Sequence, residues 1–396
     1  MNKIISRTVW IVSLVSLFTD ISSEMLYPVM PIYLKTIGFT ALWIGILEGF
    51  AEAITGLTKG YFGKWSDDIG KRLPFVQLGY SLSAISKPMM AILTFPIGIF
   101  AARSTDRLGK GMRIAARDAI LSDESDKEHK GKVFGFHRAM DTLGAAIGPV
   151  FALIYLYYHP AHYKELFIIA FIPALIGVAL TFLIREKRKT EPSIINHQPS
   201  NFFSYFSYWK KSSVNYKKTI VGLLAFTLFN SSDIFLLLMA KNIGVADQHI
   251  IGAYIFYNLI YALASYPMGM VADKIGMRNS FIIGLIFFSV VYSGIAFLKN
   301  TEMLYGLFFI YGLYAASTEG IAKAWVSKIS SKNETATAIG FFASCSSIIT
   351  LIASSTAGLI WVLFLPSVTF FISAMGTLMV IGYFFMMVKN KNYSSH

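Results

Sequence analysis

Several acidic side chains stand at helical spacing inside otherwise apolar stretches of this chain. Asp20 and Glu24 are four residues apart, as are Glu48 and Glu52, so each pair would share one face of a helix. Because charges inside apolar stretches are costly, they indicate a functional site by default. A carboxylate beside a base ionises easily, whereas one that is desolvated after the base moves away takes up a proton. The pattern therefore suits proton coupling.

A mostly basic stripe accompanies these acids. Its members follow i, i+3, i+4, i+7 spacing and are Arg103, Asp106, Arg107 and Lys110. We take four carboxylates as candidates for proton coupling: Asp20, Glu24, Glu48 and Asp106. The alternative is a static buried network that only fixes helix packing. It applies most to residues that lie near span ends or snorkel toward water, namely Lys59, Lys87 and Glu52.

The elements that carry these residues are predicted to be membrane-spanning helices. Of the 396 residues, 55% are hydrophobic and only 14% are charged, which nearly excludes a soluble protein. A spanning helix needs about 20 apolar residues. Twelve such spans are predicted, at 8–34, 41–63, 73–94, 96–118, 132–157, 165–184, 219–240, 249–271, 280–298, 303–326, 336–359 and 367–388. A single cysteine, Cys345, excludes an intramolecular disulfide and a cysteine-built metal site.

The formal net charge of +13 indicates orientation in the membrane rather than nucleic-acid binding. Basic residues are concentrated in alternate loops, and the 185–218 linker alone carries eight of them. Because cytoplasmic loops of membrane proteins are rich in Lys and Arg, both termini are predicted to be cytoplasmic. The linker divides an N-terminal six-helix bundle (1–184) from a C-terminal one (219–396). Within it, Asn201–Lys211 places aromatics before lysines, which favours an interfacial helix over a plain linker.

The two halves repeat each other at an almost constant offset. Gly63-Lys-Trp-Ser-Asp67-Asp-Ile-Gly70-Lys-Arg72 matches Gly269-Met-Val-Ala-Asp273-Lys-Ile-Gly276-Met-Arg278 at 206 residues. Two shorter matches occur at offsets of 206 and 205. The matches indicate a duplicated six-helix unit, an arrangement that places a substrate site between the halves.

These residues resemble the major facilitator superfamily. Its signature loop G-x-x-x-D-[RK]-x-G-[RK]-[RK] is present twice, although Asp68 replaces the usual base in the first copy. Gly144, Gly148 and Pro149 are similar to the G-x-x-x-G-P motif of the drug:proton antiporter branch of bacterial members. The resemblance implies an all-α fold of twelve transmembrane helices in two pseudo-symmetric bundles.

The resemblance also implies a cytoplasmic gate. Asp67 would contact the start of the eleventh span, around Thr335–Thr337, with Arg113 or Arg117 as its pairing base. A carboxylate suits a helix N-terminus, where unpaired N–H groups carry partial positive charge. The expected gating residues are Gly63, Asp67, Gly70, Arg72, Gly269, Asp273, Gly276, Arg278, Arg113 and Arg117. The alternative is a loop that only fixes topology.

In the resembling fold, the first and fourth spans line a central cavity. The polar run Asn230–Asp233 on the seventh span echoes the run that contains Asp20 and Glu24. We expect substrate contacts from Asp20, Glu24, Tyr27, Arg103, Arg107, Asn230, Asp233, Tyr254 and Asn258. Interhelical hydrogen bonding is the alternative for the polar runs, and packing is the alternative for any single aromatic residue.

Two functions follow, and neither is enzymatic. The first is proton-coupled efflux of a small organic molecule across the cytoplasmic membrane by alternating access. The second is import of an anionic metabolite or metal chelate of the siderophore kind, bound by the basic stripe; a metal-ion carrier using Asp20, Glu24 and Asp233 is a weaker variant. A membrane enzyme or an ATP-driven pump is disfavoured, because no phosphate-binding loop or H-E-x-x-H motif is present. We expect a monomer in the lipid bilayer whose partners are its substrate and protons, with no nucleic acid, cofactor or resident metal.

Overall fold

The computed structural model describes residues 5–27, 29–30, 33–34, 37–38, 41–160, 162–186, 201, 203–231, 233–245, 247–298 and 300–387. For residues 41–46, 48, 49, 234, 247, 248, 251 and 362 the description covers the backbone alone. Within these ranges, every regular element is a helix.

The N-terminal half contains six long helices. They are α1 (Arg7–Leu26), α3 (Ala41–Ile69), α4 (Leu73–Ile92), α5 (Pro96–Asp123), α6 (Lys130–Tyr158) and α7 (Tyr163–Thr181). Ser6 caps α1 by accepting a hydrogen bond from the Val9 N–H at 3.2 Å. Gly70, with φ of 69°, adopts the left-handed conformation that ends α3. The predicted first span, 8–34, is too long, because α1 ends at Leu26.

Two short helices in the linker precede the helices of the C-terminal half. The linker forms the 3₁₀ helix η1 (Ser204–Ser207) and the short helix α8 (Tyr208–Lys211). Then come α9 (Val214–Phe229), α10 (Ile234–Asn242), α11 (Asp247–Ile275), α12 (Met277–Ala296), α13 (Thr301–Ile329), η2 (Lys332–Glu334), α14 (Thr335–Leu363) and α15 (Pro366–Met387). The predicted continuous span 219–240 is wrong, because the helix is interrupted between Phe229 and Ile234.

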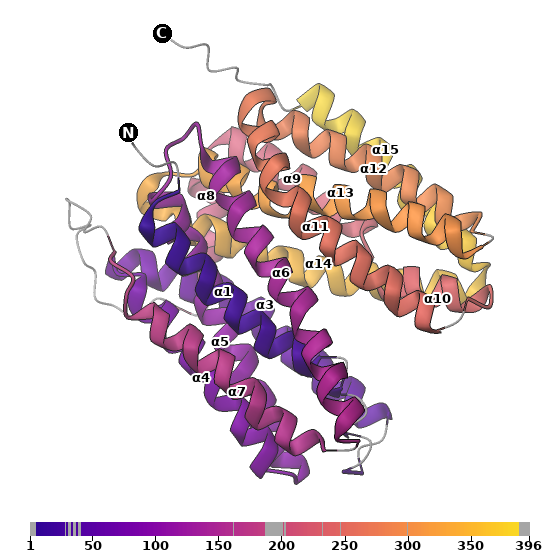
Figure 1. Cartoon of the computed structure of the whole chain (residues 1–396). Coiled ribbons are helices and arrows are strands. Elements are labelled where there is room, and N and C mark those ends of the chain that lie inside the picture. Colours follow the sequence, from indigo (N-terminus) through magenta and orange to yellow (C-terminus); the bar gives the residue numbers. More distant parts are fainter. Residues whose placement is uncertain are drawn as a thin grey trace. The chain divides into compact units, whose positions relative to one another are not determined.

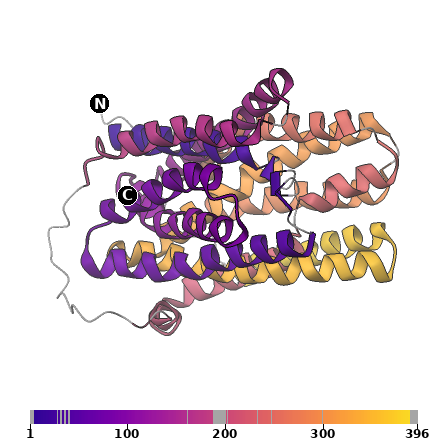
Figure 2. The same cartoon turned by 90° about the horizontal axis from the view of Figure 1, so that it is seen from below.

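Helices of the two halves pack in the same order. In the N-terminal half, α1 packs on α7, α7 on α4, α4 on α5, and α5 on α3. In the C-terminal half, α9 packs on α15, α15 on α12, α12 on α13, and α13 on α11 (Figure 1 and Figure 2). Equivalent helices take equivalent places, so the repeat seen in the sequence is also a repeat of the fold.

The chain forms two compact units that divide two of the helices. Unit 1 comprises Met1–Ser125, Met140–Lys210 and Ser331–Ser344. Unit 2 comprises Asp126–Ala139, Lys211–Ser330 and Cys345–His396. The first turns of α14 therefore belong to unit 1, and those of α6 belong to unit 2.

Lipid-compatible surfaces are present on many of the helices. Among the described residues, seven helical segments are long and apolar enough to cross a membrane; they lie in α1, α6, α7, α11, α12, α14 and α15. Helix α15 exposes Met375, Leu378 and Met379. Helix α5 is not among the seven; it carries the basic stripe.

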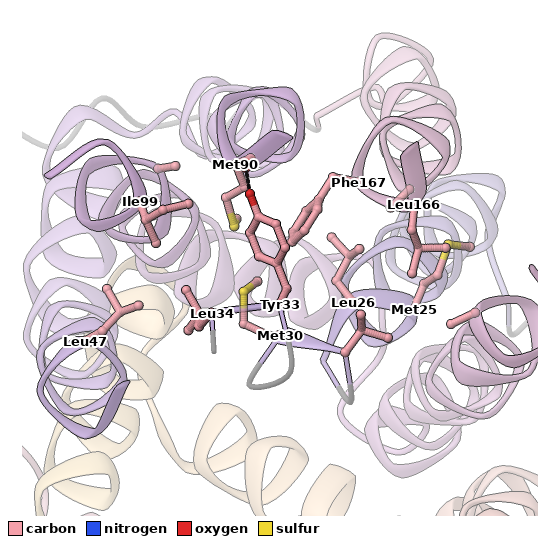
Figure 3. Packing of buried hydrophobic residues seen from close by; sticks show 14 of the residues in the cluster. Met25, Leu26, Met30, Tyr33, Leu34, Leu47, Met90, Ile99, Leu166 and Phe167 are labelled. Carbon is pink, nitrogen blue, oxygen red and sulfur yellow. Dashed lines mark hydrogen bonds between the residues drawn. The ribbon is translucent and has the colours of Figure 1, made fainter. Parts of the chain in front are cut away.

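Unit 1 has an apolar core near one end of α4. Tyr33 donates a hydrogen bond to the Met90 carbonyl at 2.9 Å, and its ring packs on Phe167 of α7 with centroids 4.9 Å apart (Figure 3). Leu26, Met30 and Met90 belong to this cluster and also line the cavity described below. The core therefore supplies the apolar side of that cavity.

Candidate functional site

A cavity of about 90 Å³ lies within unit 1 and is lined by α1, α4 and α5 together with Met30. Its walls bring together the acids of α1 and the bases of α5, as the resemblance to the family implied. The basic lining residues are Lys87, Arg103, Arg107, Lys110 and Arg113, and the acidic ones are Asp20, Glu24 and Asp106. With every group ionised, the cavity has a formal excess of two positive charges.

One of the three acids is held in a direct ion pair. The Lys87 ammonium lies 2.9 Å from Asp106 Oδ1, and Arg103 Nη1 lies 3.7 Å from Asp106 Oδ2. Lys87 is only 2% exposed, so its ammonium group does not snorkel toward water. Because a buried ion is stable only with a close partner, this pair fixes α4 against α5.

The other two acids lie near bases without forming direct ion pairs. Lys110 is a basic neighbour of Glu24, Glu52 and Asp20. Within the described residues, no Lys or Arg lies within 4.0 Å of the Glu24 or Asp20 carboxylate. In this structure Glu24 and Lys110 are therefore near each other without a direct ion pair. The Glu48 side chain, a further candidate, lies outside the described residues.

Asp20 is next to a second carboxyl group, on α6. Its side chain lies within hydrogen-bonding reach of Asp141. Asp141 accepts a hydrogen bond from Ser16 at 2.7 Å, and Arg117 Nη1 lies 3.9 Å away. The group links α1, α5 and α6 beside the cavity.

Asp67 of the signature loop is bound to the first turn of α14. Its Oδ2 accepts hydrogen bonds from the Thr337 N–H at 2.7 Å and from the Thr337 hydroxyl at 2.9 Å. The other oxygen lies 3.0 Å from Arg72 Nη2. A Cβ on Gly63 would lie 2.6 Å from the Ala336 carbonyl, so only glycine allows this approach. The contact with Thr335–Thr337 is the one that the resemblance led us to expect.

The pairing base differs from the expectation. Arg72 is the base on Asp67, and it also pairs with Asp123. Arg113 instead donates a hydrogen bond to the Ser83 hydroxyl at 2.5 Å, and its guanidinium lies over the Tyr80 ring. Arg117 pairs with Asp118 at 2.9 Å.

The second copy of the loop makes an equivalent contact within unit 2. Asp273 accepts hydrogen bonds from the Gly131 and Lys132 N–H groups, at 2.8 and 2.9 Å, at the start of α6. Gly269 lies against the Gly131 carbonyl, and Gly276, with φ of 92°, separates α11 from α12. Arg278 lies over the Phe385 ring, 5.7 Å from its centroid. Both loops therefore bind a helix N-terminus through a carboxylate.

The short linker helices lie against the first loop contact. Tyr205 covers Gly60 of α3, and Trp209 stacks on Phe341 of α14 with centroids 5.9 Å apart. Burial raises the pKa of Tyr208 above its usual value, and the charges of Glu334 and Asp67 raise it further. Whether this segment lies in the lipid headgroup layer stays a prediction.

Helix α6 approaches α1 closely at two glycines. A Cβ on Gly144 would lie 2.5 Å from the Leu17 carbonyl, and one on Gly148 would lie 2.6 Å from the Ile21 carbonyl. Pro149 follows inside the helix. The motif therefore fixes the backbone of the helix that carries Asp20 and Glu24.

Comparison with known proteins identifies the family. The model described as Major Facilitator Superfamily matches residues 12–244 and 219–395. The chain belongs to the major facilitator superfamily. An uncharacterized MFS-type transporter of Methanocaldococcus jannaschii, MJ1317, is 33% identical over 376 residues, which cover 93% of this chain and 92% of the relative. The quinolone resistance protein NorA of Staphylococcus aureus is 26% identical over 125 residues, or 32% of each chain.

Solved structures of major facilitators share the fold. The human organic anion transporter MFSD10 (TETRAN) has a TM-score of 0.78 at 15% identity, covering 96% of this chain and 99% of that one. A variant of the E. coli fucose:proton symporter FucP has a TM-score of 0.76 at 10% identity, covering 98% and 100%. The predicted all-α fold of two pseudo-symmetric six-helix bundles is confirmed. This major facilitator is a multi-pass membrane transporter of small molecules, not an enzyme.

The candidate substrate contacts of this major facilitator lie in different places. Asp20, Glu24, Tyr27, Arg103 and Arg107 line the unit 1 cavity. Asn230, Asp233, Tyr254 and Asn258 lie in unit 2, where Asp233 accepts a 2.6 Å hydrogen bond from Tyr311 and Asn258 donates to the Tyr254 carbonyl at 3.0 Å. Lys87 and Arg113 line the cavity but were not among the predicted substrate contacts. The signal available in the sequence was a basic residue within a predicted membrane span.

Proposed function

We propose that this transporter takes up a small organic anion together with protons. The observation that supports this most is the charge of the unit 1 cavity, where five bases face three acids. Lys87 and Arg103 are engaged by Asp106. Arg107, Lys110 and Arg113 also line the cavity, and their side chains are fork-shaped and point-charge donors of the kind that bind carboxylate or phosphate groups.

Proton coupling follows from the sign of the charges. Protonation of Glu24 or Asp20 removes a negative charge that competes with an anion for Lys110 and Arg107. Protons and an anion therefore strengthen each other's binding, since coupling between two ligands is reciprocal. Binding them together is symport, and a proton gradient directed into the cell would drive uptake. Glu24 faces Lys110, Arg107 and Arg103 of α5 and Asp141 of α6, while Asp20 faces Asp141, Glu24 and Arg113.

Alternating access would require the loop contacts to break. The Asp67–Thr337 contact joins α3 to α14, and the Asp273 contact joins α11 to α6. Each holds a helix of one sequence half against a helix of the other. We infer that both close the cytoplasmic side and open when substrate is released inward. In this proposal the protein resides in the cytoplasmic membrane as a monomer. Both termini are cytoplasmic, because the loops rich in Lys and Arg lie on the same side of the membrane as the termini.

Proton-coupled efflux is the second candidate. It is favoured by the close packing of Gly144 and Gly148 on α1, which matches the antiporter-type motif, and by the partial similarity to NorA. In this mechanism a cationic or neutral substrate would displace protons from Asp20 and Glu24. Protons and substrate would then weaken each other's binding, which is the opposite sign.

Flux measurements separate the two candidates. Proteoliposomes with an acidic exterior would be offered a panel of mono- and dicarboxylates, organic phosphates and organic cations, while a trapped dye reports interior pH. Uptake of an anion with acidification of the interior supports symport. Acidification driven by outward movement of a trapped cation supports efflux, and movement of neither protons nor solute contradicts both.

A further inference from the structure

The interruption between α9 and α10 places several oxygen atoms together inside unit 2. Helix α9 ends at Phe229, and Asp233 occupies the N-cap position of α10 without capping it through its side chain. Instead, the Asp233 carboxylate accepts a 2.6 Å hydrogen bond from the Tyr311 hydroxyl. Interrupted membrane helices expose polar backbone where they line a binding site. Ser232 lies outside the described residues.

Three further oxygens near this break have no hydrogen-bond partner. They are Asn230 Oδ1, Ser231 Oγ and Tyr292 Oη. Ser231 is 5% exposed and Tyr292 is fully buried. The hydroxyls of Ser231 and Tyr311 are the polar neighbours of Tyr292 Oη, which places these oxygens beside the one that binds Asp233. Unsatisfied buried polar atoms are costly, so this group calls for an occupant.

The charge at the break is also uncompensated. In the described part of the chain, no Lys or Arg forms an ion pair with Asp233. The charges that act on it are those of Glu319 and Arg138, which lie 3.6 Å from each other. The C-terminal end of α9 adds partial negative charge. One carboxylate and neutral oxygens match a single monovalent cation.

We propose that the break between α9 and α10 binds one Na⁺ ion. Asp233 and Ser231 would ligate it, with Asn230 Oδ1 and Tyr292 Oη completing the oxygen shell. Hard cations of this kind prefer oxygen ligands. Tyr257 and Tyr314 each pack on the ring of Tyr311, which binds Asp233, with centroid distances of 5.0 and 5.1 Å. This site is separate from the cavity of the proposed function, and the inference does not depend on substrate or direction.

Thermal unfolding of the purified full chain tests the proposal without any substrate. Melting curves in NaCl, KCl and choline chloride at equal ionic strength should show a saturable rise in Tm with Na⁺, of about 2 °C or more. Asp233→Asn should abolish the rise, whereas Asp126→Asn, at an exposed aspartate of unit 2, should retain it. Equal Tm values in the three salts, or a rise with choline alone, would overturn the assignment. A water molecule filling the break gives no dependence on Na⁺.

Tyr292→Phe keeps the test decisive if Asp233→Asn fails to fold. The variant preserves the ring and removes one unpartnered oxygen. If Tyr292 Oη is only a buried orphan, its removal leaves the Na⁺ response unchanged. If it ligates the ion, the Na⁺ concentration for half the Tm rise should increase roughly tenfold, the loss expected for about one hydrogen-bond equivalent. Tyr158→Phe, at an exposed tyrosine, is the matched control. An unchanged Na⁺ requirement in Tyr292→Phe removes Tyr292 from the site, and an unchanged requirement in Ser231→Ala as well would overturn the site.

Discussion

Asp67 of α3 receives two hydrogen bonds from Thr337 of α14, one from its backbone N–H and one from its hydroxyl, although the residues are 270 positions apart. The carboxylate is buried and also touches Arg72. A single side chain therefore holds the first turn of α14 against the N-terminal helices.

Neutralising Asp67 should weaken that contact and impair transport. Hydrogen bonds to a charged group contribute about 1.5–3 kcal/mol, so Asp67→Asn should lower the transport rate by roughly tenfold or more at equal membrane expression. Thr337→Val retains the backbone donor and should have a smaller effect. Asp68→Asn, at the exposed neighbouring acid, is the control and should transport normally. Wild-type flux from Asp67→Asn at equal expression would mean that the contact is not a gate.

The Lys87–Asp106 pair should behave as a structural unit. Removing one member leaves a buried, uncompensated charge, and Lys87→Met or Asp106→Asn alone should cost about 3–5 kcal/mol of unfolding free energy. The double variant should recover most of that loss. A double-mutant cycle on denaturant unfolding measures the coupling. If the losses of the two single variants simply add, the ion pair does not hold α4 against α5.

Close packing of α6 on α1 should tolerate no side chain. Gly148→Leu would place Cβ against the Ile21 carbonyl, so folded protein recovered from the membrane should fall sharply. Gly382→Leu on α15 is the matched control, since a Cβ there meets nothing within 4 Å. Size-exclusion chromatography of the solubilised variants checks this. Equal yields of monodisperse Gly148→Leu and Gly382→Leu would show that the approach is not required.

The sequence was informative where spacing or a motif determines geometry. Helical spacing placed Asp20 with Glu24, and Arg103 with Arg107, and both pairs line the cavity. The partner of Asp67 came from the resemblance to the family, whose signature loop implies a contact with the start of the eleventh span. Both inferences need only local periodicity or one known contact.

Contacts between distant helices could not be predicted in the same way. Periodicity gives the face of a helix but not its neighbour, so the pairing of Lys87 with Asp106 and of Arg72 with Asp67 was not foreseen. The break at Asn230–Asp233 was also missed, since serine and asparagine occur in continuous membrane helices as well. At the break, Asp233 is bound to Tyr311 of α13, a contact between distant helices that periodicity does not reveal.

The most direct test of proton–anion symport is the pH dependence of anion binding. The wild-type protein and Glu24→Gln would be titrated at about pH 6 and pH 8 with the anion that the proteoliposome panel identifies. The symport mechanism predicts that the wild type binds the anion more tightly at the lower pH. For one coupled proton the affinity changes by at most roughly tenfold per pH unit. In Glu24→Gln, which mimics the protonated acid, it predicts tight binding at both values. If both the wild type and Glu24→Gln bind the substrate more weakly at the lower pH, symport is contradicted and exchange of substrate against protons is favoured.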